Sequence, residues 1–186
     1  MNRALSRQRE QQRNTTDRRQ QRLSPPAQRG ADRRGMRTWS LIDRLGRPVA
    51  CALFGSAAWH CAARDAFLGW DRATRARHLH RLTSNTRFLI PAWVQVPQLA
   101  SHVLGLIARR IRTDWQAKYG HPVDALETFV DRGRFQGTCY RAANWRRLGV
   151  TQGRTRNDRA HRICAAVKDV YLYPLVADVR RALGAR

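Results

Sequence analysis

The spacing of apolar residues changes repeatedly along the chain between extended blocks and helical repeats. Extended blocks rich in β-branched and aromatic residues predict strands over residues 39–42, 49–55, 86–96, 123–131 and 167–176. A Gly-Arg-Pro turn at 46–48 joins the first two blocks and predicts a hairpin. Pro91 lies inside the third block, which predicts a bulge or bend there.

Segments with helical character separate these blocks. Short helices are predicted over 56–69, ending at Gly69, over 72–82, capped by Asp71, and over 138–149, starting at Thr138 and ending at Gly149. The longest helix has Pro97 in its first turn and ends at Gly120, because apolar residues recur at three and four residue intervals between them. Alternating strands and helices predict an α/β fold with a mixed central sheet flanked by helices.

The first 35 residues differ from the rest of the chain. They contain ten Arg, three acidic residues and almost no apolar side chains. Such a segment cannot bury enough surface to offset its ordering entropy, so the sequence predicts a disordered basic tail over 1–35 and a single domain over 36–186. The tail is interpreted either as a basic arm that contacts phosphate or as a start-site or frameshift artefact before a truncated domain.

The charge is strongly unbalanced, with 36 Lys and Arg against 13 Asp and Glu and a net charge of +23. Lys118 and Lys168 are the only lysines, so nearly all the positive charge is guanidinium. A GC-rich genome explains Arg in place of Lys, but not the excess over acidic residues. The excess therefore predicts association with a polyanion, and nucleic acid is the polyanion expected.

Cysteine spacing and hydropathy exclude several classes. The cysteines at 51, 61, 139 and 164 form no CxxC pair, so free thiols in a reducing compartment and no metal site are expected. No apolar run reaches 18 residues and the N-terminus has no apolar secretory region. The sequence therefore predicts a cytoplasmic protein without a membrane partner.

Three residues are candidates for catalysis. Glu127 lies among apolar neighbours, where a carboxylate is either paired with an arginine or serves as a general base. His102 lies in the first turns of the long helix, where free amides favour a neutral imidazole, and it is either a core histidine or a base. Tyr140 is the candidate acid.

A second set is expected to contact nucleic acid or to line a cleft. Arg87 and Arg141 differ from the other arginines because they lie inside predicted elements beside apolar or small residues, which suggests that a partner positions them. The expected contact residues are Asn85, Arg87, Ser101, Arg109, Arg110, Arg141 and Asn144. One cleft lined by Arg87, His102, Glu127, Tyr140, Arg141 and Asn144 would hold the specific contact.

Several long phrases together resemble the Druantia anti-phage protein DruA family, a domain of unknown function that is also transposase-associated. They include LIDRLGRPVACALFGSAAWHCAARDAFLGW, NTRFLIPAWVQVPQLASHVLGLIARRI and LETFVDRGRFQGTCYRAANWRRLGVTQGR, and the likeness covers about 37–178. The resemblance implies a role in phage defence or with a mobile element, and a helicase or transposase partner. Family members usually have more folded chain upstream, so a truncated member is expected.

A weaker likeness is to the GNAT acyltransferases. The segment from Tyr140 to Asn144 and Trp145 resembles their Tyr-x-x-x-Gly-Phe segment, and the order of elements is similar. In GNAT enzymes a glycine-rich loop cradles the pyrophosphate of acyl-CoA, whereas VPQLAS stands in that place here. The resemblance therefore implies a GNAT-like fold with lost or altered acyl-CoA binding, and no cofactor is expected. The alternative functions are an acyltransferase, with Glu127 or His102 as base and Tyr140 as acid, and a degenerate remnant of a transposable element.

Overall fold

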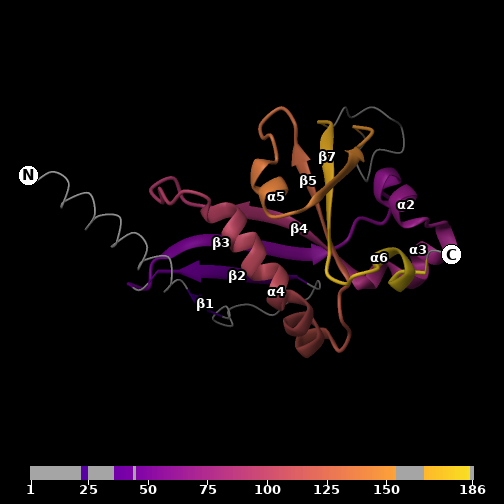
Figure 1. Ribbon diagram of the computed structural model, residues 1–186, viewed down its shortest axis with the longest axis horizontal. Coiled ribbons are helices and arrows are strands. Elements are labelled where there is room, and N and C mark those ends of the chain that lie inside the picture. The colour runs from indigo at the N-terminus through magenta and orange to yellow at the C-terminus, as the bar shows by residue number, and fades with distance from the viewer. Residues whose placement is uncertain (1–21, 25–35, 44, 154–165, 185–186) are drawn as a thin grey trace, which may run out of the picture.

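The computed structural model describes residues 22–24, 36–43, 45–153 and 166–184. Within these residues seven strands form one sheet in the order β1-β2-β3-β4-β5-β7-β6 (Figure 1). β4 and β5 are parallel and the other neighbours are antiparallel, so the predicted mixed α/β sheet is confirmed. Of the predicted tail, the structure describes only β1, Arg22–Ser24, which pairs with β2; the remainder lies outside the described residues.

The strands after β1 follow the predicted blocks in most places. They are β2 Arg37–Ile42, β3 Pro48–Ser56, β4 Leu82–Leu89, β5 Ala125–Asp131, β6 Arg146–Val150 and β7 Lys168–Pro174. The predicted hairpin is confirmed as β2 and β3, and the strands predicted over 123–131 and 167–176 are confirmed as β5 and β7.

Helices and one short 3-10 segment connect the strands. They are α2 Ala62–Leu68, α3 Arg72–His78, η1 Leu79–Arg81, α4 Leu99–Tyr119, α5 Thr138–Ala142 and α6 Val179–Ala182. Gly69 and Gly120 end α2 and α4 in the left-handed conformation, as predicted. Asp71 caps α3 by accepting a hydrogen bond from the Thr74 N–H at 2.6 Å, also as predicted. In the described part of the chain, no helix has the length and apolar character to cross a membrane.

The segment from 72 to 98 differs from its prediction. The helix predicted over 72–82 ends at His78, and β4 starts at Leu82 rather than at residue 86. Residues 82–85 are buried because all four pair with β5 and residues 83–85 also pair with β3 on the other side. β4 ends at Leu89, and α4 starts only at Leu99, after Gln98 with φ 60°, so Pro97 precedes the helix.

The helix predicted over 138–149 is also wrong in its second half. α5 ends at Ala142, and Asn144 takes a left-handed conformation with φ 63° that turns the chain. Asparagine tolerates this conformation better than most residues. The next residues form β6, the edge strand beside β7, because Arg146–Val150 finds open hydrogen-bonding groups there.

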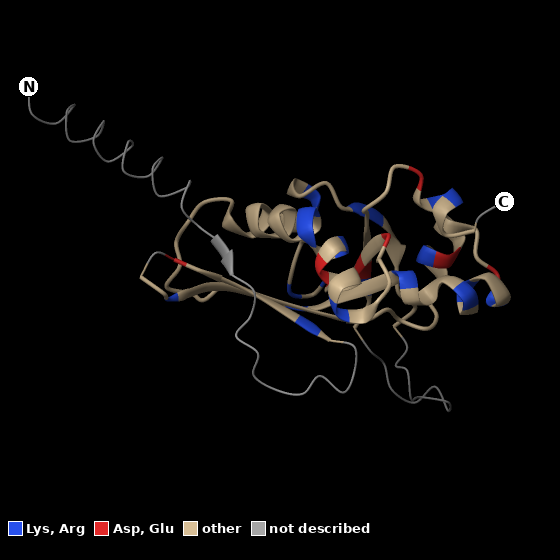
Figure 2. Cartoon of the chain, turned by 90° about the horizontal axis from the view of Figure 1, so that it is seen from below, with Lys and Arg blue, Asp and Glu red and all other residues tan. Residues whose placement is uncertain are grey.

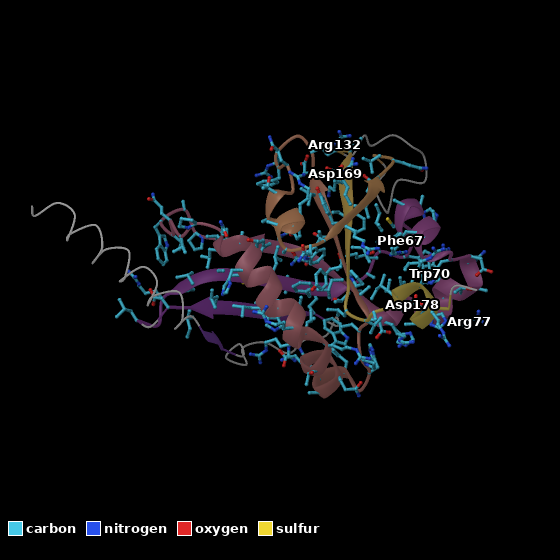
Figure 3. The ribbon with its side chains drawn as sticks, viewed as in Figure 1. Phe67, Trp70, Arg77, Arg132, Asp169 and Asp178 are labelled. Carbon is cyan, nitrogen blue, oxygen red and sulfur yellow. The ribbon has the colours of Figure 1, made fainter. Side chains whose placement is uncertain are left out.

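The two faces of the sheet carry different apolar clusters. Strand alternation places Leu126 and Tyr171 on the face covered by α4 and α5, and Ala125 and Leu172 on the face covered by α2 and α6. On the second face the Trp70 Nε1–H donates to the Leu183 carbonyl at 2.8 Å, which holds the C-terminal helix against α2 (Figure 3).

A network of buried charges fixes α2 and α3 on that second face. Arg64 is fully buried and donates to Glu127 Oε2 at 2.9 Å and to Asp65 Oδ1 at 2.7 Å. Asp65 also accepts from Arg75 of α3 at 2.9 Å, and Glu127 accepts from the Ala58 N–H at 2.7 Å. The network therefore joins β5, both helices and the loop after β3.

This arrangement predicts a large effect of breaking the network on one side. Arg64→Met leaves Glu127 buried without a cation, so the free energy of unfolding is expected to fall by about 3–5 kcal/mol in urea titrations. Arg64→Met combined with Glu127→Leu is expected to recover part of the loss, because neither change then leaves a buried unpaired charge.

The matched control is Arg47→Met, which removes an exposed ion pair to Asp43 four residues away. Its expected cost is at most about 1 kcal/mol. Equal costs for the Arg64 and Arg47 variants would contradict the importance of the buried network.

Candidate nucleic-acid interface

Basic positions are spread over many elements of the described chain, so net charge alone does not define a site (Figure 2). Many arginines are also neutralised within the fold. Each of Asp65, Asp114, Asp124 and Asp169 contacts two arginines. A candidate interface is therefore a place where exposed guanidinium groups outnumber the carboxylates near them.

The turn after β5 presents two exposed arginines. Asp131 Oδ1 accepts a hydrogen bond from the Gly133 N–H at 2.9 Å. Its backbone carbonyl accepts from the N–H groups of Arg134 at 3.2 Å and Phe135 at 2.9 Å. An aspartate that bonds the backbone two residues ahead is typical of a fixed turn. The turn consequently holds Arg132, Arg134 and Phe135 at the surface in a defined backbone conformation.

The start of α5 fixes the other side of this turn. Gly137 has φ 66°, and a Cβ built on it would lie 2.5 Å from the Tyr171 hydroxyl oxygen, so only glycine fits this approach. Arg141, one turn further along, donates to the Gln136 carbonyl at 2.6 Å and to the Tyr171 hydroxyl at 3.4 Å. These contacts hold the exposed guanidinium of Arg141 over β7.

Arg147 of β6 completes the group. It donates to Asp169 Oδ1 from Nε at 2.9 Å and from Nη2 at 2.8 Å, and this contact raises the pKa of Arg147. Arg132 Nε lies 3.6 Å from the same oxygen, where β5 ends and β7 begins (Figure 3). The side chains of Arg132 and Arg147 nevertheless remain 54% and 45% exposed.

We call this region the β5–α5 cationic surface, defined by Arg132, Arg134, Arg141 and Arg147. Two nearby carboxylates, Asp131 and Asp169, oppose its four guanidinium groups. Arginine presents a planar fork of donors that matches phosphate oxygens, so the surface has the chemistry of a phosphate-contacting site.

The structure places Tyr140 and Asn85 in direct contact. The buried Tyr140 hydroxyl donates to Asn85 Oδ1 at 2.7 Å, and the Asn85 amide donates to the carbonyls of Leu53 and Arg87. Burial raises the pKa of Tyr140 to about 12, so the phenol stays protonated at neutral pH. The pair connects α5 to the point where β4 and β5 cease to pair, at Asn85 and Thr128.

Glu127 lies on the opposite face of the sheet from Tyr140. It is 0% exposed and paired with Arg64, so it matches the structural ion-pair interpretation of the sequence. Burial raises the pKa of Glu127, and the Arg64 guanidinium and the Ala58 N–H lower it to a smaller extent. The expected common cleft of Glu127 with Tyr140 and Arg141 is therefore wrong. Side chains alternate along β5, and Glu127 points to the face away from α5, which carries Tyr140 and Arg141.

Ser101 and His102 lie together at a pocket. The pocket has a volume of about 280 Å³ and is lined by Val96, Pro97, Gln98, Leu99, Ser101, His102 and Ala142. His102 is exposed, which excludes the interpretation as a core histidine. Through Ala142 the pocket adjoins the α5 segment that carries Arg141.

The remaining predicted contact residues are dispersed. Arg87 is exposed on β4 and donates to the Thr86 carbonyl, while Arg109 is exposed on α4. Arg110 is held by Asp114 at 2.9 Å. Asn144 is exposed and forms the left-handed turn after α5. Of the predicted set, only Arg141 belongs to the β5–α5 cationic surface.

Sequence reasoning missed Arg132, Arg134, Phe135 and Arg147 as members of a site. The signal for the first three was the segment DRGRFQG between a strand and a helix, in which one arginine precedes the first glycine and the other arginine and the phenylalanine lie between the two glycines. Arg147 carries no such signal, because its segment is predicted as helix and only the pairing of β6 with β7 brings it to Asp169.

The fold is similar to that of GNAT acetyltransferases, as the sequence predicted. Dodecameric spermidine N-acetyltransferase from Vibrio cholerae in an intermediate state matches with a TM-score of 0.50 and 7% identity, over 80% of this chain and 70% of that chain. A mutant of the SpeG spermidine N-acetyltransferase from the same organism matches with a TM-score of 0.51 and 8% identity, over 80% of this chain and 69% of that chain. At such identities the likeness defines the fold class alone.

The family is defined by sequence. The model of the family described as Druantia protein DruA matches residues 35–165, and the chain belongs to that family. The chain is thus a defence-system-associated protein with a GNAT-like fold, and the predicted resemblance is confirmed. A comparison with curated proteins gives no match.

The close approach of Gly137 to Tyr171 predicts a sensitive position. Gly137→Ala introduces a left-handed alanine and an overlap with the buried ring, so the free energy of unfolding is expected to fall by about 2 kcal/mol or more. Thermal unfolding followed by circular dichroism measures the change. The control is Gly133→Ala in the same turn, where the new Cβ would meet only Asp131 Oδ1 at 3.4 Å. A Gly137 variant as stable as the Gly133 variant would contradict this account of the turn.

Proposed function

We propose that this member of the Druantia protein DruA family binds nucleic acid, and that the β5–α5 cationic surface makes the phosphate contacts. The observation that carries the proposal is the gathering of four exposed arginines from three elements around two carboxylates. Contacts with Asp169, Gln136 and Tyr171 already order Arg147 and Arg141, so less side-chain entropy is lost when phosphate binds.

The proposed setting is phage defence, or a mobile element that carries the gene. In either setting the protein meets foreign or transferring nucleic acid, and a helicase or transposase is the proposed protein partner. Charge contacts supply affinity that depends little on sequence, which suits a protein that acts on invading nucleic acid of any sequence.

An acyltransferase is the second candidate, because the fold class implies acyl-CoA at the loop before α4. The residues there do not fit a pyrophosphate. The pocket lining includes no Lys or Arg, Pro97 has no N–H, and the Leu99 N–H already donates to the Val96 carbonyl at 3.3 Å. These features support nucleic-acid binding over acyl transfer, and we derive no acyl-transfer step.

The nucleic-acid proposal predicts a steep dependence of affinity on salt. Fluorescence anisotropy with a labelled mixed-sequence oligonucleotide is expected to show a large loss of affinity between 50 and 200 mM salt. Combined Arg132→Ala, Arg134→Ala and Arg141→Ala substitutions are expected to lower the slope of log K against log salt by about 2–3, since each lost phosphate contact removes about 0.7–0.9.

The matched control removes the same charge elsewhere. Combined Arg72→Ala, Arg77→Ala and Arg180→Ala substitutions change three exposed arginines on α3 and α6. This control is expected to keep the slope of the unmodified protein. A flat salt profile of the unmodified protein would contradict nucleic-acid binding, and equal losses in both triple variants would contradict its assignment to the β5–α5 cationic surface.

The second candidate gives the opposite expectation for acetyl-CoA. Because the pocket before α4 lacks donors for a pyrophosphate, millimolar acetyl-CoA is expected to leave the melting temperature unchanged in thermal-shift measurements. A ligand present at 100 times its Kd would stabilise the fold by about 2.7 kcal/mol. A melting temperature that rises with acetyl-CoA concentration would therefore favour the acyltransferase.

A further inference from the structure

Exposed aromatic rings in the described part of the chain are each accompanied by an arginine. The residues Trp59, Trp93 and Phe135 are 46%, 53% and 58% exposed. The guanidinium carbons of Arg75, Arg47 and Arg134 lie 5.4, 5.3 and 5.3 Å from their respective centroids. An arginine over one face leaves the other face of an exposed ring available for stacking, as in proteins that bind single-stranded nucleic acid.

The pair at Phe135 differs from the other two in its electrostatic setting. Arg75 is paired with Asp65 at 2.9 Å, and Arg47 is paired with Asp43 at 2.8 Å. Arg134 makes no ion pair within the described residues, and it belongs to the β5–α5 cationic surface. Phe135 is therefore the exposed ring that combines an open face with unneutralised guanidinium groups.

The backbone around Phe135 is also held in place. Its N–H donates to the Asp131 carbonyl at 2.9 Å, and Gly137, two residues later, packs against Tyr171. A ring on a fixed turn loses little entropy when a base stacks on it. Because the ring is exposed, it adds little to the core, and it remains accessible to a ligand.

We propose that Phe135 is a base-stacking site for single-stranded nucleic acid, with Arg134 and its neighbouring arginines holding the flanking phosphates. The proposal rests on the proposed function and names its substrate class. A base in a single strand has an open face that can lie on the ring. A base within a duplex is already stacked on both sides, so the duplex reaches only the arginines.

The test compares a labelled 12-nucleotide single strand, without self-complementarity, with its duplex at fixed low salt. Anisotropy titrations use the full chain and the variants Phe135→Ala, Phe135→Leu and Phe135→Trp. The unmodified protein is expected to favour the single strand. Phe135→Ala and Phe135→Leu are expected to weaken single-strand binding by about 5- to 100-fold and to leave duplex binding unchanged, while Phe135→Trp retains it. DNA and RNA strands of one sequence show whether the site distinguishes the sugar.

The matched control is Trp93→Ala, which removes an equally exposed ring with an arginine over it, outside the β5–α5 cationic surface. It is expected to bind both forms like the unmodified protein. Three results would overturn the stacking site while leaving phosphate binding intact. The first is that Phe135→Ala weakens binding to the single strand and the duplex equally. The others are that Trp93→Ala weakens single-strand binding as much as Phe135→Ala does, or that Phe135→Leu retains single-strand binding. Absence of binding to both forms would overturn the proposed function and the stacking site together.

Discussion

The docking of α2 and α3 depends on the ion pairs and hydrogen bonds of the buried Arg64 guanidinium. A charge removed from water is tolerated only when partners surround it, and Glu127 and Asp65 supply the opposite charges. Arg64 also donates to the carbonyls of Ala58 and Trp59. These bonds have strict geometry, so the loop after β3, the two helices and β5 fit together in one arrangement. A purely apolar contact would restrict that arrangement less.

The use of acidic residues inside the fold determines the character of the surface. Asp65, Asp114, Asp124, Glu127 and Asp169 form ion pairs, while Asp71, Asp131 and Asp178 cap helices or fix a turn. In the part of the chain that the structure describes, few carboxylates are left to screen the remaining arginines. The excess positive charge therefore stays exposed, and it forms a site only where separate elements bring arginines together. The β5–α5 cationic surface is such a place, because β6 pairs with β7 opposite the turn after β5.

Much of the fold was predictable from residue patterns. Glycines ended α2 and α4, Asp71 capped α3, and extended apolar blocks located β3, β5 and β7, because these signals act within a few residues. The errors fell at β4 and β6. Leu82 was predicted as the last residue of a helix and Thr83 to Asn85 as no strand, while Arg146 to Gly149 were predicted as helix. Neither segment has a local strand signal as strong as its tertiary pairing.

The sequence by itself determined the charge, the helix ends, the mixed α/β class and the family resemblance, since each depends on composition or on residues close together in the chain. Only the tertiary structure decided which charges are neutralised. It placed Glu127 inside, on the face away from Tyr140, and it brought Arg147 and Arg132 to one aspartate. Whether an arginine is neutralised in the interior or remains available to a partner depends on residues far apart in sequence, because Coulombic pairing and burial follow distance in space.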